Sequence, residues 1–351
     1  MKKVEVAGRM IGSGHPCFVI AEAGSNHDRD YKQALRLIDV AAQAGADAVK
    51  FQVFKAEKLY SVKTPMMGYL RKNKLVKQGE RVFDLLKRLE MPRHWIDGLS
   101  KYCRKHKILF LATPFDEEAV DELERIDMPA YKIASFEITH LPLLERVAGT
   151  GKPIILSTGM ADLDDIKTAL ATIRKAGGKN VALLQCAINY PARFEDLHLR
   201  AMDTMRDTFG LPVGFSDHTL GITADIAAAA RGACIVEKHY TLSRKLSGPD
   251  HSFALEPDEL KAMVEGIRQA EASLGSPIKK HAKSEEEMYR LGRRSLVAAR
   301  DIPNGAVVKR DMIDVKRPGY GIPTKMMGAL IGRVARCDIE ADEILKWKMF
   351  R

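Results

Sequence analysis

The stretch of residues 232–257, GACIVEKHYTLSRKLSGPDHSFALEP, decides how the whole chain is interpreted. Its first apolar run, residues 233–236, is too short for a helix and has the β-branched content of a buried strand. The run then turns polar at Glu237, Lys238 and His239. Because side chains alternate along a strand, Glu237 and His239 share one face and Lys238 points to the other. A carboxylate and an imidazole side by side at a strand end suit a metal site or a proton-transfer site.

The loop after this strand contains Asp250 and His251 in the sequence GPDH, where Gly248 and Pro249 favour a turn. Taken alone, these polar residues are equally compatible with a strand end that faces solvent. The functional interpretation gains support because eight apolar runs in the chain end in polar residues in the same way.

The eight runs alternate with helical patterns between Phe18 and about Ser273. Leu35, Ile38 and Ala42, for example, keep the spacing of an amphipathic helix. Eight strands alternating with helices, over roughly the 250 residues typical of the fold, predict an α/β protein with a (β/α)8 TIM barrel. The alternative is an open doubly wound sheet, but no glycine fingerprint follows the first strand. The runs are residues 18–21, 48–49, 108–112, 131–134, 154–156, 181–186, 213–215 and 233–236.

The polar residues that end these runs are predicted to meet in space. In such a barrel, the C-terminal ends of all strands open on one mouth, where the active site lies. Residues 53–90, rich in Lys and Arg and without a helical pattern, follow the second strand and are expected to cover this mouth.

The pattern changes toward the C-terminus. Residues 1–274 are predicted to form the catalytic barrel, and the polar residues 275–292 a linker that is partly helical. Residues 293–351 contain short strand-like runs separated by turn signals at 303–305 and 318–321. This last segment is therefore expected to be a small, mostly β domain.

Composition indicates a globular enzyme, with a hydrophobic fraction of 46% and a charged fraction of 29%. No run approaches the roughly 18–20 apolar residues of a membrane span, and the N-terminus lacks the apolar core of a signal peptide. The five cysteines are scattered and include no CxxC pair, which fits reduced thiols better than disulfides. We therefore expect a cytoplasmic enzyme without a membrane partner.

The net charge of +10 is concentrated in residues 279–351, which hold 17 Lys and Arg against ten Asp and Glu. These charges are mixed with apolar residues, and no basic run is interleaved with aromatic residues as in nucleic-acid binding. Basic charge also draws small anions toward a cleft. We therefore expect anionic substrates and no nucleic acid.

Two histidines, His218 and His239, end the seventh and eighth strands, which are neighbours in the barrel. Neutral imidazoles on adjacent strand ends can share one divalent metal. Each histidine taken alone could equally be a hydrogen-bonded core residue. Asp217, Glu237 and Asp250 could add a ligand or bind metal-held water.

Lys50 and Lys132 stand at or near the ends of the second and fourth strands. With the hydroxyl residues at other strand ends, they form a set suited to a phosphate or a carboxylate. Strand-end hydroxyls also cap the helices that follow, and Ser157 is one residue for which capping is expected. The hydroxyl residues are Thr113, Ser135, Ser157 and Ser216.

Three further residues could contact a substrate. Glu22, a lone carboxylate at the first strand end, could position a hydroxyl or act as a general acid. His27 in the first loop could contact the substrate or pack inside the protein. Arg317 lies in KRPGYG, and a rigid turn of this kind can present an arginine to an anion.

Eight motifs, in order, resemble those of the sialic acid synthase family, which makes N-acetylneuraminate and related nonulosonates. The region from about Arg294, with AARDIPNGAVV and KRPGYGI, is similar to that family's C-terminal antifreeze-like (SAF) domain. The motifs are IAEAGSNH (20–27), VKFQ (49–52), TPFD (113–116), YKIAS (131–135), STGM (157–160), FSDHT (215–219), EKHYTL (237–242) and GPDHSFALEP (248–257).

This resemblance implies a reaction. C3 of phosphoenolpyruvate attacks the open-chain aldehyde of an N-acetylmannosamine-type sugar. Water adds at C2 and phosphate leaves with C–O cleavage, which gives a nine-carbon 2-keto-3-deoxy sugar acid. Members of the family use Mn2+, Mg2+ or a similar ion.

The resemblance also implies a role for each matching residue. His218 and His239 would bind the metal, while Asp250 and Arg317 would contact the sugar. Arg317 would act in trans, because the SAF domain of one subunit covers the partner's barrel in a domain-swapped homodimer. The residues implied to bind phosphoenolpyruvate are Thr113, Lys132, Ser135, Ser157 and Ser216. Those implied to be catalytic are Glu22, Lys50, Gln52, Tyr190 and Glu237.

Some positions depart from the family pattern. Gln185 replaces a histidine, and Ile188 falls where some members have an asparagine, with Asn189 one residue later. The glycine often found after the NH of the first motif is absent from Asp28 and Arg29. The acceptor therefore stays open between N-acetylmannosamine and 2,4-diacetamido-2,4,6-trideoxymannose, and the GPDH form argues against a pseudaminic acid synthase.

Two alternative functions follow from the same residues. Lys50 or Lys132 could be the nucleophile of a Schiff-base aldolase on a TIM barrel. Alternatively, the barrel could be a non-catalytic protein of polysaccharide assembly.

Overall fold

The computed structural model describes residues 2–68, 76 and 80–351. The chain divides into two compact units, Met1–Gly275 and Ser276–Arg351. Each unit has its own hydrophobic core, and each is described by itself below.

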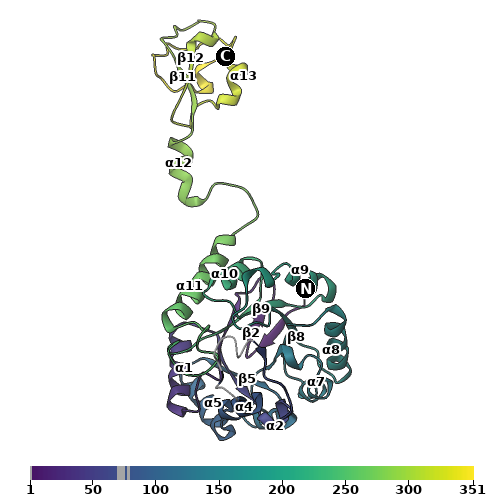
Figure 1. Cartoon of the computed structure of the whole chain (residues 1–351). Helices are drawn as coiled ribbons and strands as arrows, with labels where there is room; N and C mark the ends of the chain where they lie inside the picture. Colours follow the sequence, from purple (N-terminus) through teal and green to yellow (C-terminus); the bar gives the residue numbers. More distant parts are fainter. Residues whose placement is uncertain (1, 69–75, 77–79) are drawn as a thin grey trace. The chain divides into compact units, whose positions relative to one another are not determined.

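The first unit is a closed barrel of eight parallel strands, as Figure 1 shows face-on. Each strand pairs with the next in sequence, and β10 pairs with β3 to close the barrel. This confirms the predicted (β/α)8 architecture and excludes the open sheet. The strands are β3 (Phe18–Gly24), β4 (Ala48–Val53), β5 (Leu109–Pro114), β6 (Tyr131–Ile133), β7 (Ile154–Ser157), β8 (Val181–Cys186), β9 (Val213–Asp217) and β10 (Ile235–His239).

Helices surround the barrel and cover the outer faces of its strands (Figure 1). The α1 helix begins where the Asp30 carboxylate accepts hydrogen bonds from the first backbone N–H groups, and it buries Leu37, Ile38 and Ala41. Asp162 and Asp165 form a capping box at the start of α8. The helices are α1 (Tyr31–Gln43), α5 (Ile96–Lys105), α6 (Glu117–Glu124), α7 (Leu141–Ala148), α8 (Leu163–Lys175), α9 (Ala201–Phe209), α10 (Thr223–Ala230) and α11 (Pro257–Leu274).

A short N-terminal hairpin closes one end of the barrel. Its strands, β1 (Val4–Val6) and β2 (Arg9–Ile11), pair antiparallel, and their apolar side chains join the core inside the barrel. Phe18 at the start of β3 and Ile235 at the start of β10 belong to the same core cluster. The hairpin therefore fills the N-terminal end of the barrel and leaves the opposite mouth open.

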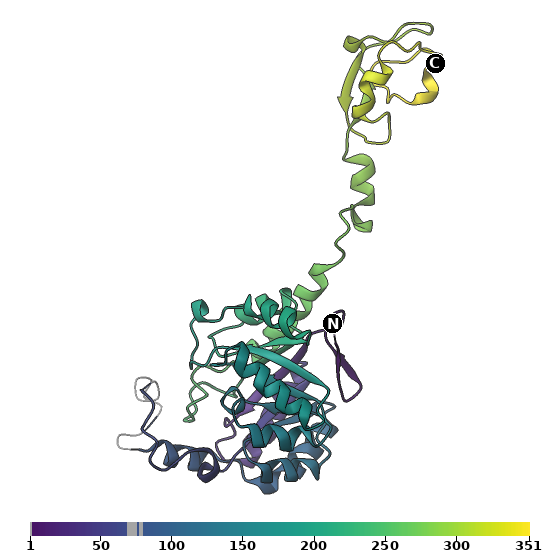
Figure 2. The ribbon, with the colours of Figure 1, turned by 90° about the vertical axis from the view of Figure 1, so that its right-hand side faces the viewer.

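The insertion after β4 contains helices, so the expectation of a helix-free segment over residues 53–90 was wrong. The described part of this segment includes the helices α2 (Ala56–Leu59) and α4 (Val82–Leu89). The α4 sequence VFDLLKRL is amphipathic, and Leu85 and Leu89 pack against Phe54 and Phe115. Figure 2 shows this insertion and the N-terminal hairpin at opposite ends of the barrel. Residues 69–75 and 77–79 of the expected cover lie outside the described residues.

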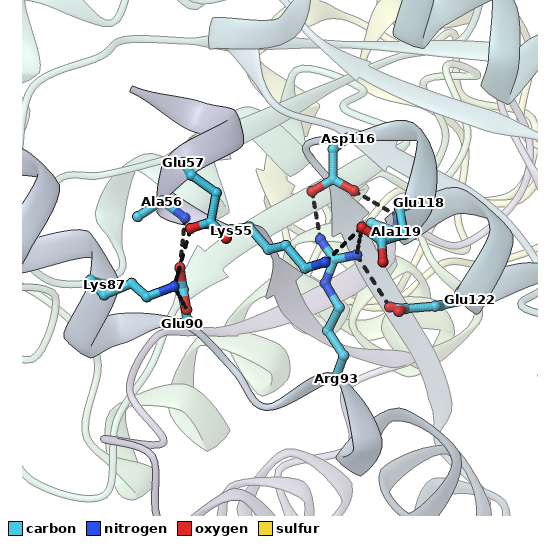
Figure 3. Close-up of polar contacts among 10 residues, drawn as sticks. All are labelled: Lys55, Ala56, Glu57, Lys87, Glu90, Arg93, Asp116, Glu118, Ala119 and Glu122. Carbon is cyan, nitrogen blue, oxygen red and sulfur yellow. Dashed lines mark hydrogen bonds and ion pairs between the residues drawn. The ribbon is translucent and has the colours of Figure 1, made fainter. Parts of the chain in front are cut away.

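Charged side chains fasten this insertion to the barrel (Figure 3). Arg93 pairs with Asp116 at 2.5 Å, and Asp116 also caps α6 through the backbone N–H of Ala119. Lys55 pairs with Glu118 of α6 at 2.6 Å. Lys55 at the start of α2 and Arg93 just after the insertion thus both hold the start of α6 through ion pairs.

A separate set of polar contacts joins α2 to the end of α4 (Figure 3). Glu90 accepts a 2.6 Å hydrogen bond from the backbone N–H of Ala56, and Lys87 pairs with both Glu57 and Glu90. Glu90 therefore binds both the start of α2, through the Ala56 N–H, and Lys87 of α4, so these contacts join the two helices.

The second unit contains few regular strands. The β11 strand (Ser295–Ala298) pairs antiparallel with β12 (Ile313–Lys316), and the other expected runs form single bridges, such as Val307 with Val334. Its short helices are α12 (Glu286–Leu291) and α13 (Met327–Leu330). The single-turn helices of the chain are η1 (Arg93–Trp95), η2 (Ser135–Glu137), η3 (Phe194–Asp196), η4 (Lys283–Glu285), η5 (Arg310–Met312), η6 (Thr324–Met326) and η7 (Trp347–Met349).

No helix within residues 2–68, 76 and 80–351 is both long enough and apolar enough to span a membrane.

Candidate active site

A cavity of about 390 Å³ opens at the C-terminal mouth of the barrel. Its floor consists of residues from the strand ends, and one wall consists of residues from the insertion. The candidate residues of the barrel line this cavity together: Glu22, Lys50, Gln52, Thr113, Lys132, Ser135, Ser157, Tyr190, Ser216, His218, Glu237, His239 and Asp250.

Strand register explains this convergence. In the parallel pairing of neighbouring strands, His239 lies opposite Glu22, and Glu22 lies opposite Lys50. Gln52 lies opposite Thr113 in the same way. Residues far apart in sequence therefore reach one level of the barrel.

Two lysines and two glutamates form a buried cluster on the floor. Lys50 Nζ lies 2.9 Å from Glu22 Oε2 and 3.0 Å from Thr113 Oγ1. Glu237 Oε1 lies between the two ammonium groups, 3.6 Å from Lys50 Nζ and 3.5 Å from Lys132 Nζ. Two ammonium groups and two carboxylates therefore lie within ion-pair distance of one another on the floor of the cavity.

The environment moves the pKa values of the two glutamates in opposite directions. Burial raises the pKa of Glu22, and Lys50 offsets this only in part. Burial also disfavours the charge on Glu237, but Lys132 and Lys50 outweigh it and lower the pKa of Glu237. Two carboxyl groups with diverging pKa values are typical of an acid and a permanent anion in one active site.

The two lysines differ as well. Burial works against the charge on Lys50, yet Glu22 and Glu237 raise the pKa of Lys50 overall. Burial lowers the pKa of Lys132, and Glu237 offsets this incompletely. Lys132 is therefore the cation that most needs an anion beside it.

The hydroxyl groups surround this cluster. Ser216 Oγ donates to Glu237 Oε1 at 3.3 Å, and Ser135 Oγ accepts a 2.9 Å hydrogen bond from the Gly159 backbone N–H. Ser157 Oγ is buried and has no hydrogen-bond partner among the residues that the structure describes. A buried hydroxyl without a partner costs free energy unless a ligand bonds to it. Ser157 was also expected to cap the following helix, but its hydroxyl forms no hydrogen bond within the described residues.

His218 and His239 face each other at the mouth, with ring centroids 5.4 Å apart. His218 Nδ1 lies 3.1 Å from the Ala187 carbonyl oxygen, a contact that requires the proton on Nδ1 and leaves Nε2 free to accept. Within the described residues, His239 Nδ1 has no hydrogen-bond partner. Burial lowers the pKa of both imidazoles, that of His218 to about 4, so both are neutral near pH 7.

These two neutral imidazoles fit part of a metal coordination shell. No group of three or more His, Cys, Asp or Glu side chains in the described ranges is arranged to hold a metal. Asp250 Oδ2 lies 4.0 Å from His239 Nδ1, and burial raises the pKa of Asp250 to about 6. The chain can therefore offer two nitrogen ligands and leave the other positions to water or substrate.

The loop that contains Asp250 is anchored by its neighbour His251, which is fully buried. His251 Nε2 lies 3.0 Å from Asp28 Oδ2, and His251 Nδ1 lies 2.6 Å from Thr241 Oγ1. Asp28 and Arg29 both adopt positive φ angles, 48° and 58°, where the family pattern has a glycine nearby. Sequence reasoning named His251 without this role and missed the partnership with Asp28, because 223 residues separate the two.

One wall of the cavity is apolar, and the sequence did not predict it. The wall comes mainly from the insertion, and the spacing of residues 82–89 was the available signal. Its members from this segment are Phe54, Leu59, Met67, Val82, Leu85, Leu86 and Leu89.

Some candidates lie elsewhere. Ile188 lines the cavity, whereas Asn189 is exposed and does not. His27 is buried against Trp95, with ring centroids 5.7 Å apart, so of its two interpretations the structure favours packing. Arg317 belongs to the second unit and is exposed there.

A TIM barrel whose mouth holds a cavity lined by two lysines, several hydroxyls and two imidazoles has the architecture of a small-molecule enzyme. Comparison with known proteins identifies the family. The chain matches the NeuB family model over residues 37–279 and the SAF domain model over residues 293–351. The chain belongs to the NeuB family.

Several of its relatives are named as synthases of legionaminic acid, pseudaminic acid or N-acetylneuraminate 9-phosphate. The chain is 42% identical to N,N'-diacetyllegionaminic acid synthase of Campylobacter jejuni, with 93% of this chain and 98% of that protein covered. It is 34% identical to human N-acetylneuraminate-9-phosphate synthase, with 96% and 93% covered. Among solved structures, N-acetylneuraminic acid synthetase from Leptospira borgpetersenii matches with a TM-score of 0.71 and 35% identity, covering 82% of this chain and 94% of that one.

Proposed function

We propose that this protein condenses phosphoenolpyruvate with the aldehyde of an N-acetylated, mannosamine-type sugar. The products would be a nonulosonic acid and inorganic phosphate. The observation that carries this proposal is the buried floor of two lysines and several hydroxyls beside two neutral imidazoles, on a chain of the NeuB family.

Phosphoenolpyruvate would bind on the floor of the cavity. Lys132 needs an anion because burial lowers its pKa, and Ser157 Oγ needs a hydrogen-bond partner. A phosphate or carboxylate supplies both. Thr113, Ser135 and Ser216 would complete the set, as all three line the same cavity.

His218 and His239 would hold the divalent metal, Mn2+ or Mg2+. When bound there, the ion would polarise the sugar aldehyde as a Lewis acid. The neutral state of both rings supports this role, because only a neutral imidazole can donate a lone pair.

The reaction forms one carbon–carbon bond and breaks one carbon–oxygen bond. C3 of phosphoenolpyruvate bonds to the aldehyde carbon, whose oxygen takes up a proton. Water bonds to C2, the bond from C2 to the bridging oxygen breaks, and phosphate departs with that oxygen. Water loses both protons as the C2 ketone forms, one balancing the proton on the former aldehyde oxygen and one leaving with phosphate. Glu22 suits the proton delivery because burial raises its pKa, and Gln52 orients it by donating a 2.9 Å hydrogen bond.

The remaining anion, Glu237, would stay ionised and stabilise positive charge that develops at C2. Lys132 and Lys50 lower its pKa, so it remains an anion throughout. Lys50 would hold Glu22 and Glu237 in place, as its Nζ lies 2.9 Å from Glu22 Oε2 and 3.6 Å from Glu237 Oε1.

The sugar would lie between Tyr190, Asp250 and the apolar wall. Tyr190 packs edge-on to His218 with ring centroids 4.5 Å apart, so it borders the proposed aldehyde position. Asp250 approaches His239 from the loop that follows β10. The apolar wall suits the methyl group of an acetamido substituent.

We also propose a domain-swapped homodimer in which Arg317 of one copy reaches the sugar in the other. Exposed apolar side chains follow four consecutive strands at the rim of the mouth, and exposed groups of this kind mark interaction surfaces. They are Phe136, Met160, Phe194 and Leu220. Hybrid dimers of Arg317→Ala and Glu22→Gln variants should regain activity, and the absence of rescue would rule out action in trans.

A cytoplasmic location belongs to the same proposal. Four of the free cysteines, Cys17, Cys103, Cys186 and Cys234, are buried thiols, and reduced thiols are typical of that compartment.

One observation favours a second candidate, the Schiff-base aldolase. Burial lowers the pKa of Lys132, as it does for lysines that attack carbonyl groups. Borohydride with a keto acid would then trap an adduct on lysine, and activity would survive EDTA.

A phosphate-release assay tests the proposed function. Phosphoenolpyruvate is incubated with a panel of N-acetylated mannosamine derivatives, with EDTA, and with EDTA followed by Mn2+. We expect sugar-dependent phosphate release that EDTA abolishes and Mn2+ restores. Phosphate release without the sugar, or none with any member of the panel, would refute the proposal and leave the non-catalytic alternative.

A further inference from the structure

A buried cluster of charges lies directly behind the two histidines, on the helix-facing side of the barrel strands. It consists of Lys238, Asp217 and Asp225, whose side chains are 1%, 0% and 0% exposed. None of the three lines the cavity, so the proposed reaction does not use them.

Strand alternation places this cluster. Lys238 lies opposite Asp217 in the register of β10 and β9. Each residue is also the sequence neighbour of one histidine, Lys238 of His239 and Asp217 of His218. Because neighbouring side chains on a strand point to opposite faces, the ion pair forms behind the imidazoles that face the mouth.

The cluster forms hydrogen bonds with the residues on both sides of His218, namely the side chain of Asp217 and the backbone of Thr219. Lys238 Nζ donates a hydrogen bond of 2.7 Å to the Thr219 carbonyl and also bonds to the Asp217 carboxylate. Asp217 in turn accepts from the Thr219 backbone N–H and from its hydroxyl, each at 2.9 Å. His218 therefore lies between two residues that one lysine of the next strand holds.

Stability alone does not explain such a cluster. A buried ion pair seldom stabilises a protein more than apolar side chains of the same size would. Both carboxylate oxygens of Asp225 lack a hydrogen-bond partner within the described residues, which adds to the cost of the cluster. We therefore look for the role of this cluster in the conformation of the residues that it contacts.

We propose that Lys238 is a positioning residue for the metal site. Through the Thr219 carbonyl and the Asp217 carboxylate, it fixes the turn after β9 so that the His218 imidazole faces His239 before a metal arrives. This inference rests on the metal site of the proposed function.

The test compares Mn2+ affinity, measured by electron paramagnetic resonance of the free ion, in the full-length protein and its variants. The main variant is Lys238→Met with Asp217→Asn, which removes both charges but leaves an amide oxygen to accept from the Thr219 N–H. We expect Mn2+ binding to weaken about 10–100-fold, as when groups that support metal ligands are lost. Thr219→Ala is the milder variant, which loses only the hydroxyl contacts and should bind Mn2+ a few-fold more weakly.

Two controls separate positioning from a general loss of stability. Asp225→Asn should bind Mn2+ like the parent, because it leaves the bonds of Lys238 to Asp217 and to the Thr219 carbonyl in place. Arg268→Met removes ionic contacts to Asp47 and Glu271 at the other end of the barrel. It should lower the thermal midpoint and leave Mn2+ affinity unchanged.

The outcomes are distinct. Parent-like Mn2+ affinity in both the double variant and Thr219→Ala would overturn the inference, as would an equal loss in Arg268→Met. A parent protein that releases phosphate from phosphoenolpyruvate and sugar without binding Mn2+ would overturn the inference and the metal site but leave the condensation intact. A parent that binds Mn2+ but releases no phosphate would refute the function alone.

Discussion

Replacing Glu237 by glutamine should destabilise the protein by removing one charge from the floor of the cavity. Glu237 is the only carboxylate in the described part of the chain that forms an ion pair with Lys132, whereas Lys50 would keep Glu22 at 2.9 Å. Glutamine has nearly the same shape, so the variant creates no cavity. The change therefore isolates the electrostatic effect of leaving Lys132 buried and unpaired.

The magnitude has two limits. If Lys132 stays charged, breaking a buried ion pair costs about 3–5 kcal/mol. If Lys132 loses its proton instead, the cost at pH 7 has a ceiling of about 4–5 kcal/mol, since the ordinary lysine pKa is near 10.4 and each unit corresponds to about 1.4 kcal/mol. The first route predicts a loss of about 3–5 kcal/mol in the free energy of unfolding at pH 7, and the second limits that loss to about 4–5 kcal/mol.

The pH dependence identifies the cause. A lysine whose pKa is lowered by folding destabilises the protein below its unfolded pKa, and this penalty fades as pH rises toward that value. The ceiling falls to about 2 kcal/mol at pH 9 by the same arithmetic. The deficit of Glu237→Gln relative to the parent should therefore shrink between pH 7 and pH 9.

Urea denaturation of both proteins at pH 7 and pH 9 measures this effect. Glu118→Gln is a suitable control, because Glu118 is half exposed and its pair with Lys55 should be worth less than about 1 kcal/mol. An unchanged midpoint for Glu237→Gln, or a deficit that is the same at both pH values, would refute the reasoning.

Three further predictions concern the candidate site and its surroundings. His239→Ala should weaken Mn2+ binding by more than about 100-fold while the circular dichroism spectrum stays unchanged, and parent-like binding would show that His239 is not a ligand. Glu22→Gln should retain phosphoenolpyruvate binding by calorimetry but slow turnover about 100-fold or more, since it removes the proposed acid; normal turnover would assign that role elsewhere. Burial lowers the pKa of His27 to about 4, so the unfolded chain binds the extra proton below about pH 6.5 and stability falls as the pH drops. Between pH 7.5 and pH 5, the free energy of unfolding of His27→Gln, measured with urea, should therefore fall by about 2 kcal/mol less than that of the parent. Equal decreases in the two proteins would exclude this role of His27.

The barrel could be predicted because its signals are local. Each central strand is a short apolar run with a polar end, and the parallel register brings Glu22, Lys50 and His239 to one level. The sequence therefore indicated both the fold and most of the cavity floor. The hairpin of β1 and β2 escaped notice because strands of three residues have too few positions to show alternation.

The packing of α4 and the contacts of Lys238 could not be predicted, because both depend on residues that are distant in the sequence. The α4 helix looked like a charged loop, since its apolar face is recognisable only once Phe54 and Phe115 supply a surface for it. Strand alternation indicated that Lys238 points away from the mouth. Its contacts with Asp217 and Thr219 depend on how β9 and β10 pair.

The fate of one oxygen atom tests the central claim most directly. Phosphoenolpyruvate labelled with 18O at the oxygen between C2 and phosphorus is turned over with the accepted sugar and Mn2+, and the released phosphate is examined by 31P NMR. Attack of C3 on the aldehyde, followed by water at C2, predicts that the released phosphate retains the label. Unlabelled phosphate would show that the P–O bond had broken, and would contradict the proposed condensation.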